Sequence, residues 1–161
     1  MSTSTERTEE RVVVSTFVAV KPDAAFEIFT RDIDLWWRRT PRYRRMLEQA
    51  GTLAFEGTPP ERLVEQGGAS VTVLGRVLAW EAGKRLVFEW QAGELADALH
   101  SEVEVRFEPL RGGTRVTLEH RGLDQLPVNH PARRGLTGEA FGAMFGYFWA
   151  DALASYRLRC G

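Results

Sequence analysis

The chain has 161 residues, of which 43% are hydrophobic and 27% charged, and its formal net charge is −1. These values are ordinary for one soluble globular domain and give no overall electrostatic reason to bind nucleic acid or an anionic membrane. The single cysteine, Cys160, excludes an intramolecular disulfide framework and favours a reducing compartment. No apolar run approaches the ~20 residues that span a bilayer, and the polar N-terminus lacks the apolar core of a secretory signal. We therefore expect a cytoplasmic protein that does not bind membranes.

The N-terminal part predicts a disordered tail over residues 1–11 and a single domain over residues 12–161. Residues 11–20 are rich in β-branched side chains, which is typical of a strand. Pro22 then suits the start of a short helix over residues 24–30, because proline lacks the N–H that a first turn leaves unused. A second short turn over residues 32–37 carries Trp36 and Trp37.

A cluster of arginines follows this turn, over residues 38–45. Its members are Arg38, Arg39, Arg42, Arg44 and Arg45. Such a cluster can bind phosphate or an acidic partner surface. The alternative is a solvated loop whose charges are balanced by acidic residues elsewhere.

The middle of the chain predicts an antiparallel meander. The expected strands cover residues 52–56, 61–66, 69–80, 85–91, 101–108 and 114–121, and short turns join them. Val103, Val105 and Phe107 alternate with charged residues, so one face of the sheet is apolar and the other is wet.

The longest helical pattern, residues 138–158, comes at the end of the chain. Phe141, Phe145 and Trp149 recur at four-residue steps, which predicts an aromatic face that packs on the apolar side of the sheet. Gly142 and Gly146 lie beside this face, and glycine inside a helix costs ~1 kcal/mol relative to alanine. The helix therefore either seals a core or forms the lid of an internal cavity.

The turns also predict which residues face one another across the strands. They set Phe88 opposite Val77, Trp90 opposite Gly75, and Ser101 opposite His120. With Phe88 also facing Val103, one inner row reads Gly75, Trp90, Ser101 and His120. The same register sets Arg76 opposite Glu89 on the outer face and Val105 opposite Val116. Two small residues in that row predict a pocket between sheet and helix. Its expected lining is Gly75, Trp90, Ser101, His120, Phe141, Phe145 and Trp149, with Trp36 or Trp37 near the mouth.

The sequence carries no familiar catalytic motif. His100, His120 and His130 lack metal-ligand spacing, Gly112-Gly113 is a hairpin turn, and no serine has a nucleophile-elbow context. His120 is the one titratable side chain expected on the apolar face, as a hydrogen-bonded core residue or as a general acid or base. We expect no metal and no cofactor.

Several segments resemble those of a known family. They are residues 25–30 (AFEIFT), 35–37 (LWW), 75–81 (GRVLAWE), 85–90 (RLVFEW) and 114–120 (TRVTLEH), followed by the terminal aromatic helix. The chain resembles the START-like, or SRPBCC, superfamily, and within it the bacterial activator of heat-shock-protein-90 ATPase homologues. The resemblance implies an α+β helix-grip fold, in which a curved antiparallel sheet of about seven strands grips a long C-terminal helix. Two short helices follow the first strand.

The resemblance and the residues leave three hypotheses. The first is a binder of a small hydrophobic molecule that catalyses no reaction. The second is a cyclase- or dehydratase-type enzyme that uses His120 as general acid or base. The third is a partner-binding module, for example a stress-related chaperone regulator, that uses the arginine cluster. Either a monomer or a homodimer is compatible with the sequence.

Overall fold

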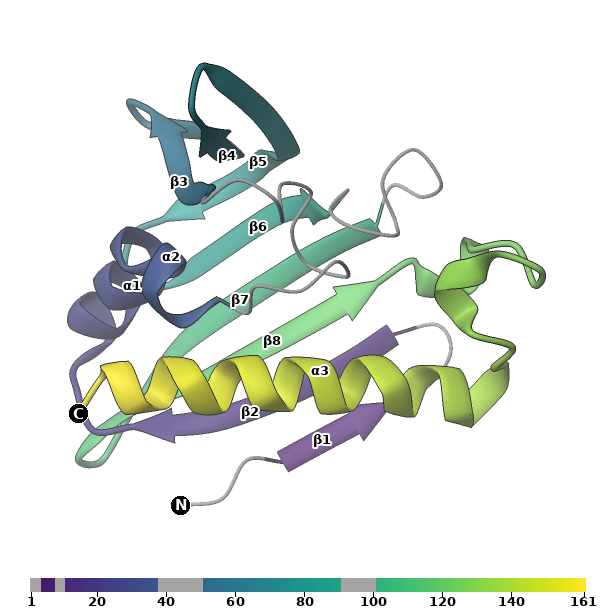
Figure 1. Ribbon diagram of the computed structural model, residues 1–161. Helices are drawn as coiled ribbons and strands as arrows, with labels where there is room; N and C mark the ends of the chain where they lie inside the picture. The colour runs from purple at the N-terminus through teal and green to yellow at the C-terminus, as the bar shows by residue number, and fades with distance from the viewer. Residues whose placement is uncertain (1–3, 8–10, 38–50, 91–100) are drawn as a thin grey trace.

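The computed structural model describes residues 4–7, 11–37, 51–90 and 101–161 (Figure 1). Its strands are β1 (Ser4–Arg7), β2 (Arg11–Val18), β3 (Thr52–Gly57), β4 (Pro60–Gly67), β5 (Ser70–Glu81), β6 (Arg85–Trp90), β7 (Ser101–Leu110) and β8 (Gly113–Arg121). Its helices are α1 (Pro22–Arg31), α2 (Ile33–Trp36) and α3 (Gly138–Arg159), and two single 3-10 turns, Leu123–Gln125 and Pro131–Arg133, lead into α3. The described elements form the predicted helix-grip fold.

The strands form one antiparallel sheet in the order β1-β2-β8-β7-β6-β5-β4-β3. The run from β3 to β8 is the expected meander, and β2 closes the sheet by pairing with β8. Helix α3 lies along β2 and β1 across one face, while α1 and α2 pack near its C-terminal end (Figure 1). Tyr156 of α3 donates a hydrogen bond to the carbonyl oxygen of Ala25 in α1 (2.7 Å), which joins the long helix to the short ones.

The first strand differs from the expectation of a disordered tail. Residues 4–7 pair antiparallel with residues 12–15 of β2. A polar stretch gives no apolar alternation to recognise, yet an edge strand can form through main-chain hydrogen bonds alone. The prediction for residues 1–11 was therefore wrong for this segment.

The predicted register is confirmed on one side of the sheet and wrong on the other. Phe88 pairs with Val77 and with Val103, and Trp90 pairs with Ser101, as predicted. Between β7 and β8, however, His120 pairs with Val103 rather than Ser101.

The cause of this difference is the turn between the two strands. Leu110 pairs directly with Gly113, so the turn has only two residues, and Gly112 has a left-handed φ of 83°. A two-residue loop suits an antiparallel hairpin. It moves the pairing by two residues, so Val105 faces Leu118 instead of Val116. An even shift keeps every side chain on its predicted face.

The outer face of the sheet carries ion pairs between neighbouring strands. The guanidinium of Arg76 lies 3.0 Å from the Glu89 carboxylate, as the predicted register required. Arg121 reaches Glu104 at 2.8 Å and Glu119 at 2.9 Å. The inner face contains the buried apolar residues, so the alternation in the sequence is confirmed in the fold.

Candidate functional site

The centre of the inner face is an aromatic cluster around His120 of β8, to which α3, β6 and the end of α2 contribute side chains. The imidazole ring of His120 lies 5.8 Å from the rings of both Phe145 and Trp149, and 6.3 Å from that of Trp90. Trp37 completes the cluster, 4.9 Å from Trp90 and 5.6 Å from Trp149. No side chain in this group is more than 4% exposed. The sequence grouped Trp90, His120, Phe145 and Trp149, and offered Trp37 as one of two candidates beside them; that they bind a ligand stays a prediction.

A single chain of hydrogen bonds runs through this cluster. The indole N–H of Trp149 donates to Nδ1 of His120 (3.0 Å), and Nε2 of His120 lies 2.7 Å from Oγ of Ser101. The Ser101 hydroxyl in turn donates to the carbonyl oxygen of Trp90 (3.2 Å). An indole nitrogen can only donate, so Nδ1 must be the acceptor and the proton of the neutral ring is on Nε2. The indole N–H of Trp149 thus fixes which group donates and which accepts in each of these hydrogen bonds.

The surroundings of His120 keep its ring neutral. The side chain is fully buried, and burial lowers its pKa to about 3 because the charged form loses its hydration. No carboxylate offsets that effect within the hydrogen-bond chain. At neutral pH the cluster is therefore uncharged. It consists of aromatic side chains around one polar line, the hydrogen-bonded groups of Trp149, His120 and Ser101.

This arrangement argues against His120 as a general base or acid. The only lone pair of the neutral ring, on Nδ1, is occupied by the Trp149 N–H, and the Nε2 proton is directed to Ser101. A catalytic base needs its acceptor within hydrogen-bond reach of a substrate proton. The hydrogen-bonded core residue, one of the two alternatives left by the sequence, matches this geometry.

Gly75 has a different role from the one that the sequence indicated. A Cβ built on Gly75 would lie 1.7 Å from the carbonyl oxygen of Glu89 in the adjacent strand. The lack of a side chain thus permits two backbones to approach closely. Gly75 therefore does not provide the open space that its place in the predicted pocket row implied.

The remaining predicted lining residues lie at the margins of the cluster. Phe141 contacts Phe145, with ring centroids 5.4 Å apart. Trp36 packs beyond Trp37, against Phe29 and Tyr156, and its indole N–H donates to the Phe29 carbonyl (3.1 Å). Of the two candidates for the pocket mouth, Trp37 is the one that contacts Trp90 and Trp149.

A buried arginine beside the cluster was not foreseen. Arg133 is 1% exposed, and its guanidinium lies 4.3 Å from the centre of the Phe141 ring. It donates to the carbonyl oxygens of Leu126 (2.7 Å) and Asp124 (3.3 Å) and so fixes the loop that leads into α3. Nothing in the sequence distinguishes Arg133 from its exposed neighbour Arg134, because no periodic pattern covers this loop.

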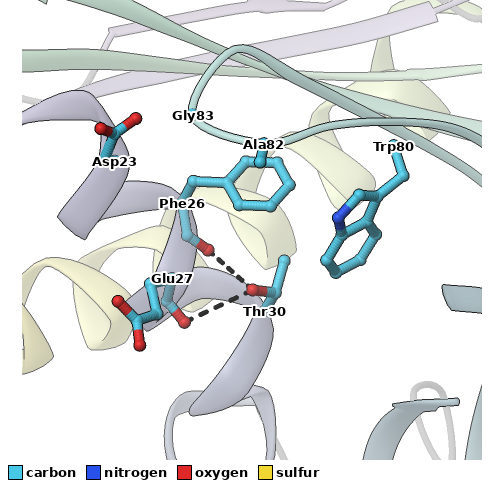
Figure 2. Close-up of a pocket in the computed structure, with 7 residues that line it drawn as sticks. All are labelled: Asp23, Phe26, Glu27, Thr30, Trp80, Ala82 and Gly83. Atoms are coloured by element: carbon cyan, nitrogen blue, oxygen red, sulfur yellow. Dashed lines mark hydrogen bonds between the residues drawn. The ribbon is translucent and has the colours of Figure 1, made fainter. Parts of the chain in front are cut away.

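A pocket lies on the surface between α1 and the β5–β6 turn, away from the cluster around His120 (Figure 2). It is a pocket of ≈ 420 Å³ lined mainly by Asp23, Phe26, Glu27, Thr30, Trp80 and Gly83. It shares no residue with the cluster around His120. The sequence predicted the short helix that carries Phe26 but no pocket beside it.

The arginine cluster, Arg38, Arg39, Arg42, Arg44 and Arg45, lies outside the described residues, so its role in partner binding stays a prediction. Within the described ranges, no group of three or more His, Cys, Asp or Glu side chains is placed to hold a metal ion. In the same part of the chain, no helix combines the length and apolar character needed to cross a membrane.

Comparison with known families agrees with the fold. Residues 19–155 match the model of the family described as Activator of Hsp90 ATPase homolog 1-like protein. The chain belongs to this family. The match covers both short helices, the meander and most of α3, so it also supports membership of the START-like, or SRPBCC, superfamily. Domains of this fold commonly bind hydrophobic ligands.

Solved structures show the same architecture at low sequence identity. MLL2253 from Mesorhizobium loti is 22% identical, with a TM-score of 0.60 over 92% of this chain and 95% of its own. CalU16 from Micromonospora echinospora is 18% identical, with a TM-score of 0.58 over 96% and 83%. An AHSA1-like protein from Aeromonas hydrophila is 15% identical, with a TM-score of 0.61 over 92% and 90%. No curated protein matches the sequence. At these identities the structural likeness establishes the fold alone.

Proposed function

We propose that the protein binds a small hydrophobic molecule between the inner face of the sheet and α3, at the aromatic cluster around His120. The observation that carries the proposal is the composition of that cluster. Trp37, Trp90, Phe145 and Trp149 surround one polar line, and ligand sites combine apolar walls with a few placed polar groups in this way. An aliphatic core would bury the same area without the need to satisfy a histidine and a serine.

The ligand enters by displacing Trp37. This residue follows directly after the four-residue helix α2, where the backbone is already extended (φ −71°, ψ 138°). Its ring packs tilted on Trp90, with an interplanar angle of 33°, so a flat apolar molecule can replace the same contact. Trp90 and Trp149 lie on regular elements and form the fixed walls of the site.

Two measurements test the proposal. Native mass spectrometry of the protein as purified is expected to show an additional non-covalent mass that organic extraction removes. A neutral apolar dye, N-phenyl-1-naphthylamine, is then expected to bind the extracted protein and to quench tryptophan fluorescence by occupying the site beside Trp90 and Trp149.

A matched pair of variants locates the dye. Phe145→Leu removes a ring that contacts His120, whereas Phe29→Leu removes an equally buried ring that contacts Trp36 and Tyr156. Loss of one aromatic contact weakens binding by about fivefold, taking about 1 kcal/mol for such a contact. That loss is expected for Phe145→Leu and not for Phe29→Leu. Equal affinities in both variants, or no dye binding at all, would contradict the proposal.

A further inference from the structure

The surface pocket between α1 and the β5–β6 turn has a floor of two aromatic rings, and other aromatic side chains pack against both of them. The rings of Phe26 and Trp80 meet at right angles, with centroids 5.1 Å apart and an interplanar angle of 88°. Phe107 supports Phe26 at 5.2 Å, and Phe55 supports Trp80 at 5.4 Å. Because their neighbours hold both rings, the floor is formed before any ligand arrives.

The rim of the same pocket is acidic. Asp23 and Glu27 are four residues apart on α1 and therefore share one face of the helix, toward the side of the pocket opposite Trp80 (Figure 2). No lysine or arginine lines the pocket. Like charges at this spacing repel each other modestly, and a bound cation would relieve that repulsion.

The two carboxylates differ in their present contacts. Glu27 forms an exposed ion pair with Arg31 (2.6 Å), whereas Asp23 has no hydrogen bond or ion pair with the described part of the chain. A Cβ at Gly83 would lie 2.2 Å from Oδ1 of Asp23, so this glycine leaves room for the carboxylate at the pocket edge. The hydroxyl of Thr30 donates to the Phe26 carbonyl (2.8 Å), which leaves its oxygen able to accept a hydrogen bond from a ligand.

We propose that this pocket is a second binding site, separate from the cluster around His120, and that it takes a small organic cation with an apolar body. The ammonium group lies beside Asp23 and Glu27, where it forms charge-assisted hydrogen bonds. The body covers Phe26 and Trp80, which attract both apolar surface and positive charge. The pocket volume of ≈ 420 Å³ lies within the range of small-molecule sites.

Three probes of similar size and different charge test this assignment. In ¹H–¹⁵N spectra of the full chain, 2-phenylethylammonium is expected to shift the indole N–H signal of Trp80, identified by its loss in Trp80→Phe. An open site of this kind binds its ligand at about millimolar Kd. The neutral 2-phenylethanol and the anionic 3-phenylpropanoate are expected to bind at least about tenfold more weakly, because they cannot form the charge-assisted contacts.

Charge variants separate a specific site from general attraction. Asp23→Asn is expected to weaken 2-phenylethylammonium binding about tenfold, and Asp23→Asn/Glu27→Gln to abolish the Trp80 shift. Glu139→Gln, an exposed carboxylate in the first turn of α3, is the control and should leave binding unchanged. All three variants should retain the wild-type melting temperature within a few degrees, since exposed charges contribute little to stability.

Three results would overturn the proposal. One is an affinity for 2-phenylethanol equal to that for the ammonium probe, which would mean that charge plays no part. The second is unchanged 2-phenylethylammonium affinity in Asp23→Asn/Glu27→Gln. Absence of any Trp80 response to the ammonium probe in the wild-type protein would equally contradict it.

Discussion

The two faces of strands β7 and β8 hold their polar side chains in opposite ways, one without charge and the other through ion pairs. On the inner face, His120 is fully buried and neutral, and hydrogen bonds join it to Trp149 and Ser101. On the outer face, the next residue, Arg121, is charged and binds three carboxylates, those of Glu102, Glu104 and Glu119.

The pKa values of the two faces diverge accordingly. Burial alone lowers the pKa of His120. Burial also disfavours ionisation of Glu104, but hydrogen bonds from Arg121 and Arg85 outweigh it and leave the pKa of Glu104 lowered. Burial likewise opposes the charge of Arg121, yet its hydrogen bonds to the carboxylates raise its pKa. Adjacent residues of β8 thus lie in opposite environments: His120 is kept neutral by burial, whereas Arg121 is kept charged by its carboxylate partners.

The largest expected effect tests how closely the backbones of β5 and β6 approach each other at Gly75. Gly75→Ala places a Cβ against the carbonyl oxygen of Glu89, a backbone atom that cannot turn aside. We expect the free energy of unfolding to fall by about 3 kcal/mol or more. Gly112→Asn is the control, because a side chain there meets nothing within 4 Å and asparagine tolerates the left-handed φ of 83°. Urea unfolding checks both variants, and equal stability for the two would refute the close approach at Gly75.

The second effect tests the polar line through the aromatic cluster. His120→Leu leaves the buried Trp149 N–H without its acceptor and the Ser101 oxygen without its donor, so we expect a loss of about 3 kcal/mol. Ser101→Ala is expected to cost less, about 1–2 kcal/mol, because it leaves one Nε2 proton unsatisfied.

The double variant His120→Leu/Ser101→Ala sharpens this result. Once His120 is gone, loss of the Ser101 hydroxyl no longer leaves an Nε2 proton unsatisfied, so the combined cost should be smaller than the sum of the two single costs. Additive costs in urea unfolding would mean that the two side chains do not act as one hydrogen-bonded unit.

The third effect is a pH dependence of the free energy of unfolding, which arises from His120 on the inner face. The folded pKa of His120 is about 3, below the ~6.5 of an unfolded histidine. The unfolded chain therefore takes up a proton that the folded protein does not, and the contribution of His120 is fully present above pH ~6.5 and is lost as the pH falls toward 3. Between about pH 7.5 and about pH 5 the loss from this residue is about 2 kcal/mol.

The same His120→Leu variant measures that contribution. Urea unfolding at both pH values should show a drop for the wild-type protein that is about 2 kcal/mol larger than the drop for the variant, since the two proteins differ only at residue 120. Identical pH dependence of the two proteins would mean that His120 binds a proton as readily in the folded as in the unfolded state, contrary to its burial among aromatic rings.

The sequence predicted most of the division between the inner and outer faces of the sheet, because alternation along a strand assigns each side chain to a face. It placed Trp90, His120 and Trp149 on the inner side and Glu89 with Arg76 on the outer side. It could not give the two-residue turn at Gly112, which decides that His120 pairs with Val103. It also missed the backbone approach at Gly75, since a glycine beside open space and a glycine beside a carbonyl look the same in a sequence. The surface pocket depends on how α1 lies against the β5–β6 turn, which is a tertiary arrangement that no local pattern encodes.

The smallest effect belongs to the outer face, and its dependence on salt is the informative quantity. Arg121→Met keeps the apolar stem but leaves three carboxylates close together, and we expect a loss of about 1 kcal/mol at low ionic strength, as for a partly exposed ion-pair network. In about 1 M NaCl the screening length falls to about 3 Å, so the loss should shrink to a fraction of that value. The cost of Ser101→Ala, measured in the same two solutions, should not change in this way, because the inner hydrogen bonds are buried and uncharged. If Arg121→Met costs the same at both salt concentrations, the arginine contributes by packing rather than by charge, and the contrast between the two faces of β8 reduces to a difference in burial.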